Sequence, residues 1–151
     1  MLQQKEPSDF VIGTGQAHSV REFTEKALSY IGIKIQWKNS GIRERGVIRE
    51  FAPGFDSMRG KFKKGDTLIL VDPMYFRPTE VDYLLADNSK AKKVLGWSPK
   101  IKLQELVEIM MDYYLEALNL NSPGRGIQIS KEKGFGWTTH AYSSQTISTT
   151  A

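Results

Sequence analysis

The sequence predicts one α/β domain of short strands and three main helices. Residues 19–31 and 103–118 carry apolar side chains at helical spacing, and a third, shorter helix is expected to end at Gly96. Residues 33–37 alternate apolar with polar side chains, and residues 67–71 form an apolar run, as strands do. With 151 residues, 40% of them hydrophobic, the chain is long enough to bury one core.

The first helix has clear start and stop signals. Ser19 and Glu22 have the spacing of a capping box, in which the hydroxyl and the carboxylate satisfy free backbone amides at the helix start. Gly32 is expected to end the helix. One face of the helix is apolar, with Val20, Phe23, Ala27 and Ile31.

Strands are expected on both sides of this helix. Residues 10–12 (Phe-Val-Ile) are interpreted as a short buried strand that ends at the flexible Gly13-Thr14-Gly15 turn. Residues 33–37 form the second strand, so the predicted unit is strand, helix, strand. Residues 38–65 follow as a long, solvated, basic loop, because they are rich in Gly, Arg and Lys and show no sustained periodicity.

The second half of the chain predicts two more strands. Residues 67–71 form one, which Asp72-Pro73 ends because proline cannot donate to a sheet ladder. Residues 83–86 (Tyr-Leu-Leu-Ala) are interpreted as the other.

Two helices and a tail complete the prediction. Asp87 or Ser89 is expected to cap the short helix that Gly96 closes. The long helix at 103–118 lacks a good N-cap, because Lys102 precedes it. From about residue 121 the composition shifts to Ser, Thr, Gly and Lys, which predicts a disordered tail over 121–151.

Composition and charge exclude several classes of function. The net charge of +4 is too small to indicate a nucleic-acid partner, and the absence of cysteine excludes disulfides and thiolate metal sites. No apolar run approaches the roughly 20 residues of a membrane span, and the first eight residues contain no signal-peptide core. We therefore expect a cytoplasmic protein without a membrane partner.

Two motifs resemble cofactor or catalytic signatures without completing them. Gly13-x-Gly15 before a helix suggests a dinucleotide-binding loop, but His18 stands where the third glycine is needed. Tyr30 and Lys34 have a Tyr-x-x-x-Lys spacing, but the helix is expected to end between them, so the two side chains do not share a face. We interpret Tyr30 as a core aromatic residue.

Polar and aromatic residues crowd into residues 71–82, between two predicted strands. Arg77 offers a planar fork of donors that matches phosphate oxygens, and Glu80 has acceptors for the vicinal hydroxyls of a ribose. The pair is typical of a sugar-nucleotide site. A structural ion-pair network of Arg77, Glu80 and Asp82 explains the same residues and stays open.

These residues also carry a resemblance to a known family. Tyr75-Phe-Arg-Pro-Thr-Glu-Val-Asp82, continued by Leu95-Gly-Trp-Ser-Pro99, resembles the carboxy-terminal signature of the GDP-mannose 4,6-dehydratases. Asp9-Phe-Val-Ile12 and His18-Ser-Val-Arg-Glu-Phe23 resemble a second block of that family in the same order. The resemblance covers about residues 1–118; the basic stretch at 42–64 and the segment after Leu120 depart from it.

The resemblance implies an extended short-chain dehydrogenase/reductase of the NAD-dependent epimerase/dehydratase type, a lyase of nucleotide-sugar metabolism on the route to GDP-fucose. In such an enzyme an NADP-binding Rossmann domain comes first and a smaller domain binds GDP-mannose. Residues 1–120 match only that substrate-binding domain, with the basic loop 38–65 inside it, so the Rossmann domain is largely absent.

Site residues follow from the resemblance position by position. Arg77 and Glu80 are implied to contact the diphosphate and the ribose, with Tyr75 and Asp82 beside them, while Arg21 is expected to brace its helix. No residue matches the family's catalytic or NADP-binding positions, which we expect to lie upstream. The chain alone is therefore expected to be inactive, and to form homo-oligomers or join full-length dehydratase subunits.

Two alternatives stay open. The chain would also fit a non-catalytic GDP-sugar-binding or regulatory module that partners a full-length dehydratase. A small nucleic-acid binder would use the basic stretch from Arg43 to Lys64 with Phe51, Phe55 and Phe62, although a solvated loop explains those residues equally well. A face left uncovered by a missing domain also predicts self-association.

Overall fold

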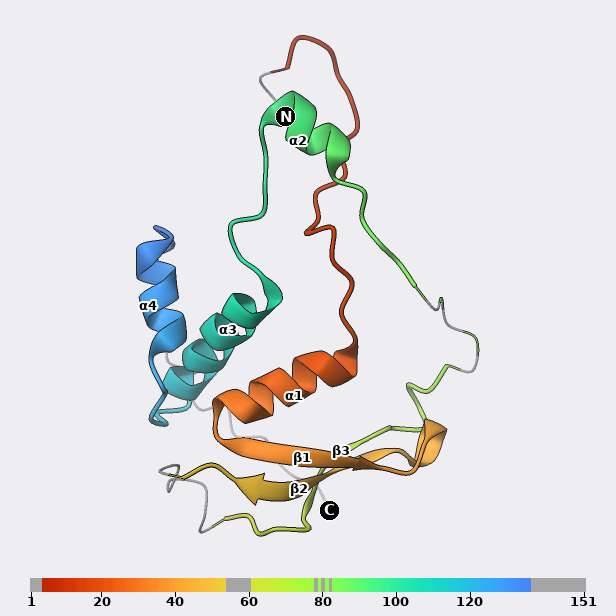
Figure 1. Cartoon of the computed structure of the whole chain (residues 1–151), viewed down its shortest axis with the longest axis vertical. Helices are drawn as coiled ribbons and strands as arrows, with labels where there is room; N and C mark the ends of the chain where they lie inside the picture. The colour runs from red at the N-terminus through yellow and green to blue at the C-terminus, as the bar shows by residue number, and fades with distance from the viewer. Residues whose placement is uncertain (1–3, 54–60, 78, 80, 82, 137–151) are drawn as a thin grey trace, which may run out of the picture.

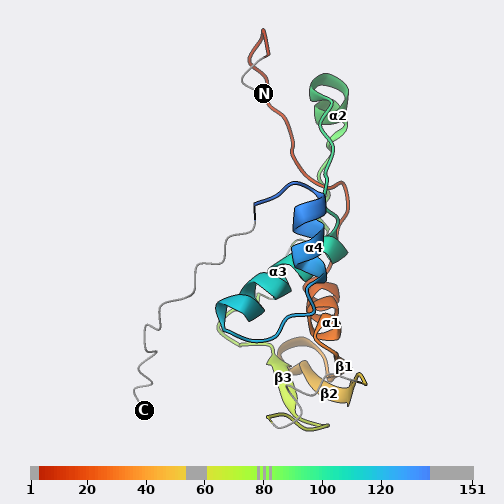
Figure 2. The ribbon, with the colours of Figure 1, turned by 90° about the vertical axis from the view of Figure 1, so that its left-hand side faces the viewer.

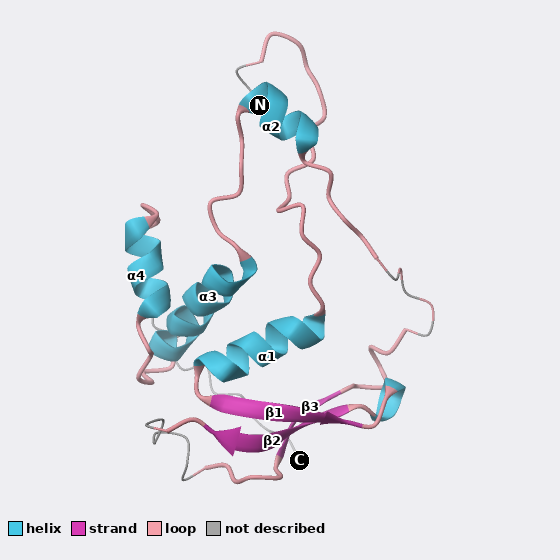
Figure 3. Cartoon of the chain, in the orientation of Figure 1, coloured by secondary structure: helices cyan, strands magenta, loops and turns pink. Residues whose placement is uncertain are grey.

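The computed structural model describes residues 4–53, 61–77, 79, 81 and 83–136. Within these residues it contains four α-helices, one short 3-10 helix and a three-stranded antiparallel sheet in the order β1-β2-β3 (Figures 1 and 3). The elements are α1 (Val20–Tyr30), β1 (Ile33–Lys38), η1 (Gly41–Arg43), β2 (Arg45–Phe51), β3 (Thr67–Leu70), α2 (Ser89–Leu95), α3 (Leu103–Ala117) and α4 (Arg125–Glu132).

The chain divides into two regions that we call the body and the arm. The body comprises α1, the sheet, α3 and α4; the arm comprises residues 4–18 and 83–102 and contains α2. Figures 1 and 2 show the arm extending away from the body, with α2 at its far end.

The core of the body lies between the sheet and its helices. Ile31, Ile33 and Ile48 form its buried centre. Partly buried side chains pack around them from α1, all three strands, α3 and the segment before β3: Leu28, Tyr30, Ile35, Phe51, Phe62, Leu68, Met111 and Leu115. The predicted helix at 19–31, the strand at 33–37, the strand at 67–71 and the helix at 103–118 are thus confirmed, with ends shifted by at most one residue.

Helix boundaries follow local chemistry. Ser19 is the N-cap of α1, and its hydroxyl accepts the N–H of Glu22 at 3.0 Å. Gly32 adopts a φ of +78° immediately after the helix, a conformation that glycine tolerates better than other residues. At the start of α3 the N–H of Lys102, the N-cap residue, donates to the Glu105 carboxylate at 2.9 Å, while the Lys102 side chain makes no cap hydrogen bond, as predicted.

In the arm, two segments far apart in sequence lie side by side. The Asn88 side chain donates to the carbonyl of Gly13 at 2.6 Å, and Lys90 contacts Ser8 and lies 5.0 Å from the Phe10 ring centroid. Asn88 is the N-cap residue of α2, and Asp87 accepts the N–H of Ser89 at 2.9 Å. Gly96 closes the helix in the left-handed conformation, as predicted.

The predicted strands at residues 10–12 and 83–86 are wrong. Neither segment belongs to a sheet, and Val11, Ile12, Leu84 and Leu85 are at least half exposed. A strand requires a ladder partner, and a run of three or four apolar residues carries no information about whether one exists. The strand, helix, strand unit is therefore reduced to α1 followed by β1.

The prediction of one uninterrupted loop over 38–65 is also wrong, because β2 and η1 lie inside it. Gly46, Val47 and Ile48 are buried in succession, and the register of β2 against β3 shifts between Gly46 and Val47. This irregularity hides the period of two by which a strand is recognised.

The tail expected to be disordered from residue 121 contains α4, so that prediction is wrong for Arg125–Glu132. The buried carboxylate of Asp112 on α3 accepts the N–H of Gly124 at 3.2 Å and that of Ile127 at 3.1 Å. These bonds satisfy free amides at the start of α4. Gly126 allows close packing on α3, because a Cβ there would clash with the backbone of Glu108.

Candidate functional site

The segment that follows β3 forms a turn on the surface of the body. A backbone hydrogen bond fixes the start of the turn: the N–H of Val71 donates to the carbonyl of Glu44 at 3.3 Å. Asp72 then organises the turn, since its side chain accepts the N–H of Met74 at 2.9 Å and its carbonyl accepts the N–H of Tyr75 at 3.1 Å. The turn projects the side chains that follow Asp72 outward.

Two of the four predicted site residues lie on or directly after this turn. Tyr75 is 76% exposed, and Arg77 is exposed two residues later. Glu80 and Asp82 lie outside the described residues. A surface depression of about 350 Å³ between α1 and α3, lined by Glu25, Lys26, Ser29, Tyr30 and Gln104, contains neither Tyr75 nor Arg77.

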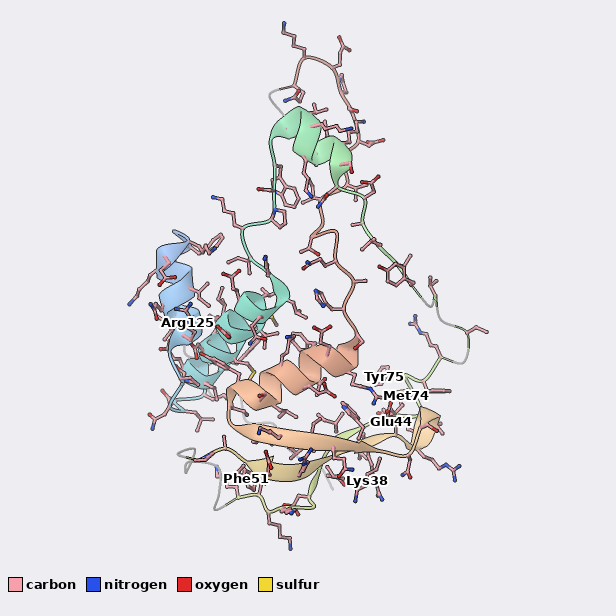
Figure 4. The ribbon with its side chains drawn as sticks, viewed as in Figure 1. Lys38, Glu44, Phe51, Met74, Tyr75 and Arg125 are labelled. Atoms are coloured by element: carbon pink, nitrogen blue, oxygen red, sulfur yellow. The ribbon has the colours of Figure 1, made fainter. Side chains whose placement is uncertain are left out.

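A polar cluster beside the turn includes Glu44, which the sequence analysis did not identify. Arg21 pairs with Glu44, and its guanidinium lies 4.9 Å from the ring centroid of Trp37. The indole N–H of Trp37 donates to Glu25 at 2.6 Å. Figure 4 shows Glu44, Met74 and Tyr75 at the same end of the sheet. Glu44 was missed because it falls in the stretch expected to be a loop.

The Gly13-x-Gly15 turn does not fit a dinucleotide. Asn88 occupies the space beside it, with its side chain on the Gly13 carbonyl and 3.5 Å from where a Cβ of Gly15 would lie. No strand precedes the turn, and the cap of α1 is filled by Ser19. The Gly13-x-Gly15 turn therefore does not form a backbone cradle for a pyrophosphate.

Tyr30 and Lys34 do not form a catalytic pair. The Tyr30 hydroxyl donates to Asp112 at 2.8 Å and accepts the N–H groups of Arg125 and Gly126, while Lys34 pairs with Glu50 at 2.6 Å. Burial, with the hydrogen bond to Asp112, raises the pKa of the Tyr30 phenol above its ordinary value. The Tyr30 hydroxyl thus joins α1 to α3 and α4, whereas Lys34 is engaged by another partner on the sheet.

The basic stretch offers little to a nucleic acid. Phe51 and Phe62 pack against the core, which removes them from the stacking role that single-stranded nucleic acids require. Phe55 lies outside the described residues.

Among the helices of the described residues, none is long and apolar enough to cross a membrane.

Comparisons with known proteins agree with the motifs at this turn. A family model described as GDP-mannose 4,6 dehydratase matches residues 1–110. A GDP-mannose 4,6-dehydratase of Vibrio cholerae serotype O1 is 41% identical over 136 residues, which are 87% of this chain and 36% of that protein. The GDP-mannose 4,6 dehydratases of Drosophila melanogaster and Homo sapiens are 45% and 41% identical over 121 residues, 80% of this chain. These alignments span 27% and 29% of the two proteins, so the chain corresponds to about a third of its relatives' length.

Proposed function

Because this chain belongs to the GDP-mannose 4,6-dehydratase family, we propose that it is the substrate-binding portion of such an enzyme and that it binds GDP-mannose at the turn after β3. The single observation that carries the proposal is the match over residues 1–110, which includes the whole Tyr75–Asp82 motif.

The geometry of the turn supports this role. A guanidinium that binds a diphosphate must be accessible from solvent. Arg77 is exposed, two residues after the exposed ring of Tyr75. The turn is anchored to the sheet through Val71 and Glu44, which limits the entropy lost when a ligand binds. Glu80 and Asp82 are proposed to complete the site at the ribose.

Calorimetric titration of the purified chain with GDP-mannose tests the proposal. We expect binding, and we expect Arg77→Ala to weaken it about tenfold or more, because a hydrogen bond to a charged group contributes about 1.5–3 kcal/mol. GDP alone should retain most of the affinity and mannose alone should show none.

The matched control for this experiment is Arg125→Ala. Arg125 is another exposed arginine, on α4, paired with Glu132 and well separated from Tyr75 in Figure 4. This variant should bind as the unchanged chain does. Equal affinity of the unchanged chain and the Arg77→Ala variant would contradict the assignment of Arg77, and an absence of binding by the unchanged chain would contradict the proposed function.

We further propose that catalysis requires groups that the described residues do not supply. No NADP cradle is present at Gly13-x-Gly15, and Tyr30 and Lys34 are committed to separate structural contacts. The chain mixed with GDP-mannose and NADP should therefore form no GDP-4-keto-6-deoxy-mannose by chromatography. Turnover by the purified chain would refute this part of the proposal.

A further inference from the structure

We propose that Arg21 is a positioning residue for the nucleotide-binding turn: through Glu44 it sets where the segment carrying Tyr75 and Arg77 begins. The inference rests on the proposed function for its consequence in binding, but not for its structural content. Arg21 would touch no part of the substrate.

A short chain of contacts links Arg21 to the turn. The Arg21 guanidinium pairs with the carboxylate of Glu44, and the carbonyl of the same Glu44 accepts the N–H of Val71 at 3.3 Å. Val71 is the residue directly before Asp72, which organises the turn. Displacing Glu44 therefore displaces the first backbone contact of the turn.

A second contact holds Arg21 in place. Its guanidinium lies 4.9 Å from the Trp37 ring centroid, and the Trp37 indole is itself fixed by the hydrogen bond to Glu25, one turn further along α1. The Trp37 ring thus restricts the Arg21 side chain independently of Glu44. Less conformational entropy is therefore lost when the ion pair forms.

The position of Arg21 in its helix argues against a role in α1 alone. Arg21 is the second residue of α1, where the positive end of the helix dipole disfavours a cation. The favourable partners of Arg21 all lie outside the first turn of its own helix: Glu44 before β2 and Trp37 on β1. The residue therefore stabilises a tertiary contact, and that contact leads to the turn.

Hydrogen exchange read by mass spectrometry tests the inference without any ligand, on a peptide that begins at least two residues before Val71 and extends to Arg77. Arg21→Ala should speed exchange of the Val71, Met74 and Tyr75 amides by about fivefold, the effect of losing one partly exposed ion pair and its cation–π contact. Glu44→Gln removes the same pair from the other side and should act in the same direction. Arg21→Lys keeps the charge without the planar stack and should restore part of the protection.

Lys34→Ala is the matched control, because Lys34 and Glu50 form an exposed ion pair at 2.6 Å on the same sheet, at the opposite end of the β1–β2 pair from Glu44. It should leave exchange at 71–77 unchanged. Equal exchange in the Arg21→Ala variant and the unchanged chain, or equal acceleration by Lys34→Ala, would overturn the inference.

The binding experiment separates this inference from the proposed function. If the unchanged chain binds GDP-mannose, Arg21→Ala should weaken binding, because affinity scales with the ordered fraction of the turn, but by a smaller factor than it speeds exchange, which scales with the open fraction. If the unchanged chain does not bind, the proposed function fails while the exchange result still decides the role of Arg21. Faster exchange with unchanged affinity would overturn the link between Arg21 and the site.

Discussion

The body and the arm have similar local sequence patterns but reach different structures. In the body, Ile33 and Ile48 on neighbouring strands are each 1% exposed. In the arm, Val11 and Leu84 stand in equally apolar runs and are 52% and 78% exposed. The difference is that the body contains strands that pair with one another, whereas the two segments of the arm meet through side-chain contacts, those of Asn88 and Lys90.

An apolar run becomes a buried strand only where another strand pairs with it and a helix packs on it. α1 packs on β1 and α3 packs on α1, and the Tyr30–Asp112 hydrogen bond joins those two helices to the start of α4. The arm offers no comparable covering layer among the described residues: Ala91 of α2 is buried, but Val11, Tyr83 and Leu84 are more than half exposed. The body should therefore carry most of the free energy of unfolding.

The largest expected effect comes from deleting a core side chain. Ile48→Ala should lower the free energy of unfolding by about 2–5 kcal/mol, because it removes buried methyl groups and leaves a cavity. Val11→Ala in the arm should change it by less than about 0.5 kcal/mol. Urea unfolding followed by circular dichroism measures both free energies. Similar losses of stability in the two variants would contradict the assignment of most of the stability to the body.

A smaller effect is expected at a buried carboxylate. Asp112→Ala leaves three partly buried donors, the Tyr30 hydroxyl and the amides of Gly124 and Ile127, without their acceptor. At about 1 kcal/mol each, the lower end of the usual range, the loss should lower the free energy of unfolding by about 3 kcal/mol. α4 should lose its protection from hydrogen exchange at the same time.

The control for this variant lies in the arm. Asp87 also accepts a backbone N–H, that of Ser89 at the start of α2, but it is exposed. Asp87→Ala should cost less than about 1 kcal/mol, since water replaces the lost acceptor. A larger loss for Asp87→Ala than for Asp112→Ala would contradict the assignment of stability to the body.

A substitution where the arm joins the body should lower the free energy of unfolding by about 1 kcal/mol. Ser19→Ala removes the acceptor for the Glu22 amide where the arm enters α1, and loss of an N-cap typically has this cost. Thr24→Ala is the control on the same helix, because its hydroxyl donates only to the carbonyl of Val20 within α1. Thermal unfolding of the two variants should separate them by a few degrees.

The smallest effect on unfolding is expected at the most exposed leucine of the arm. Leu84→Ser should change the free energy of unfolding by less than about 0.5 kcal/mol. We expect it instead to reduce self-association, because exposed apolar side chains of the arm are available for contacts between copies. Size-exclusion chromatography of the 17.1 kDa chain checks this, and a monomeric unchanged chain would contradict it.

The candidate site was partly predictable. Arg77 and Tyr75 stood out because charged and aromatic residues rarely crowd between two apolar runs, and the structure places both at the surface next to a side-chain-organised turn. Glu44 was not predictable, because its significance depends on Arg21, 23 residues earlier, and on Val71, which follows β3. Such contacts join residues that no local window contains.

The sequence by itself determined the elements whose hydrogen bonds close within a few residues. The Ser19 cap, the stop at Gly32, the long apolar face of α3 and the left-handed Gly96 are all readable because helix bonds join neighbours in the chain. Only the tertiary structure decided which apolar runs became strands and that α4 forms. A strand needs a partner from elsewhere in the chain, and the start of α4 depends on Asp112 and Tyr30, whose burial beside it no local pattern encodes.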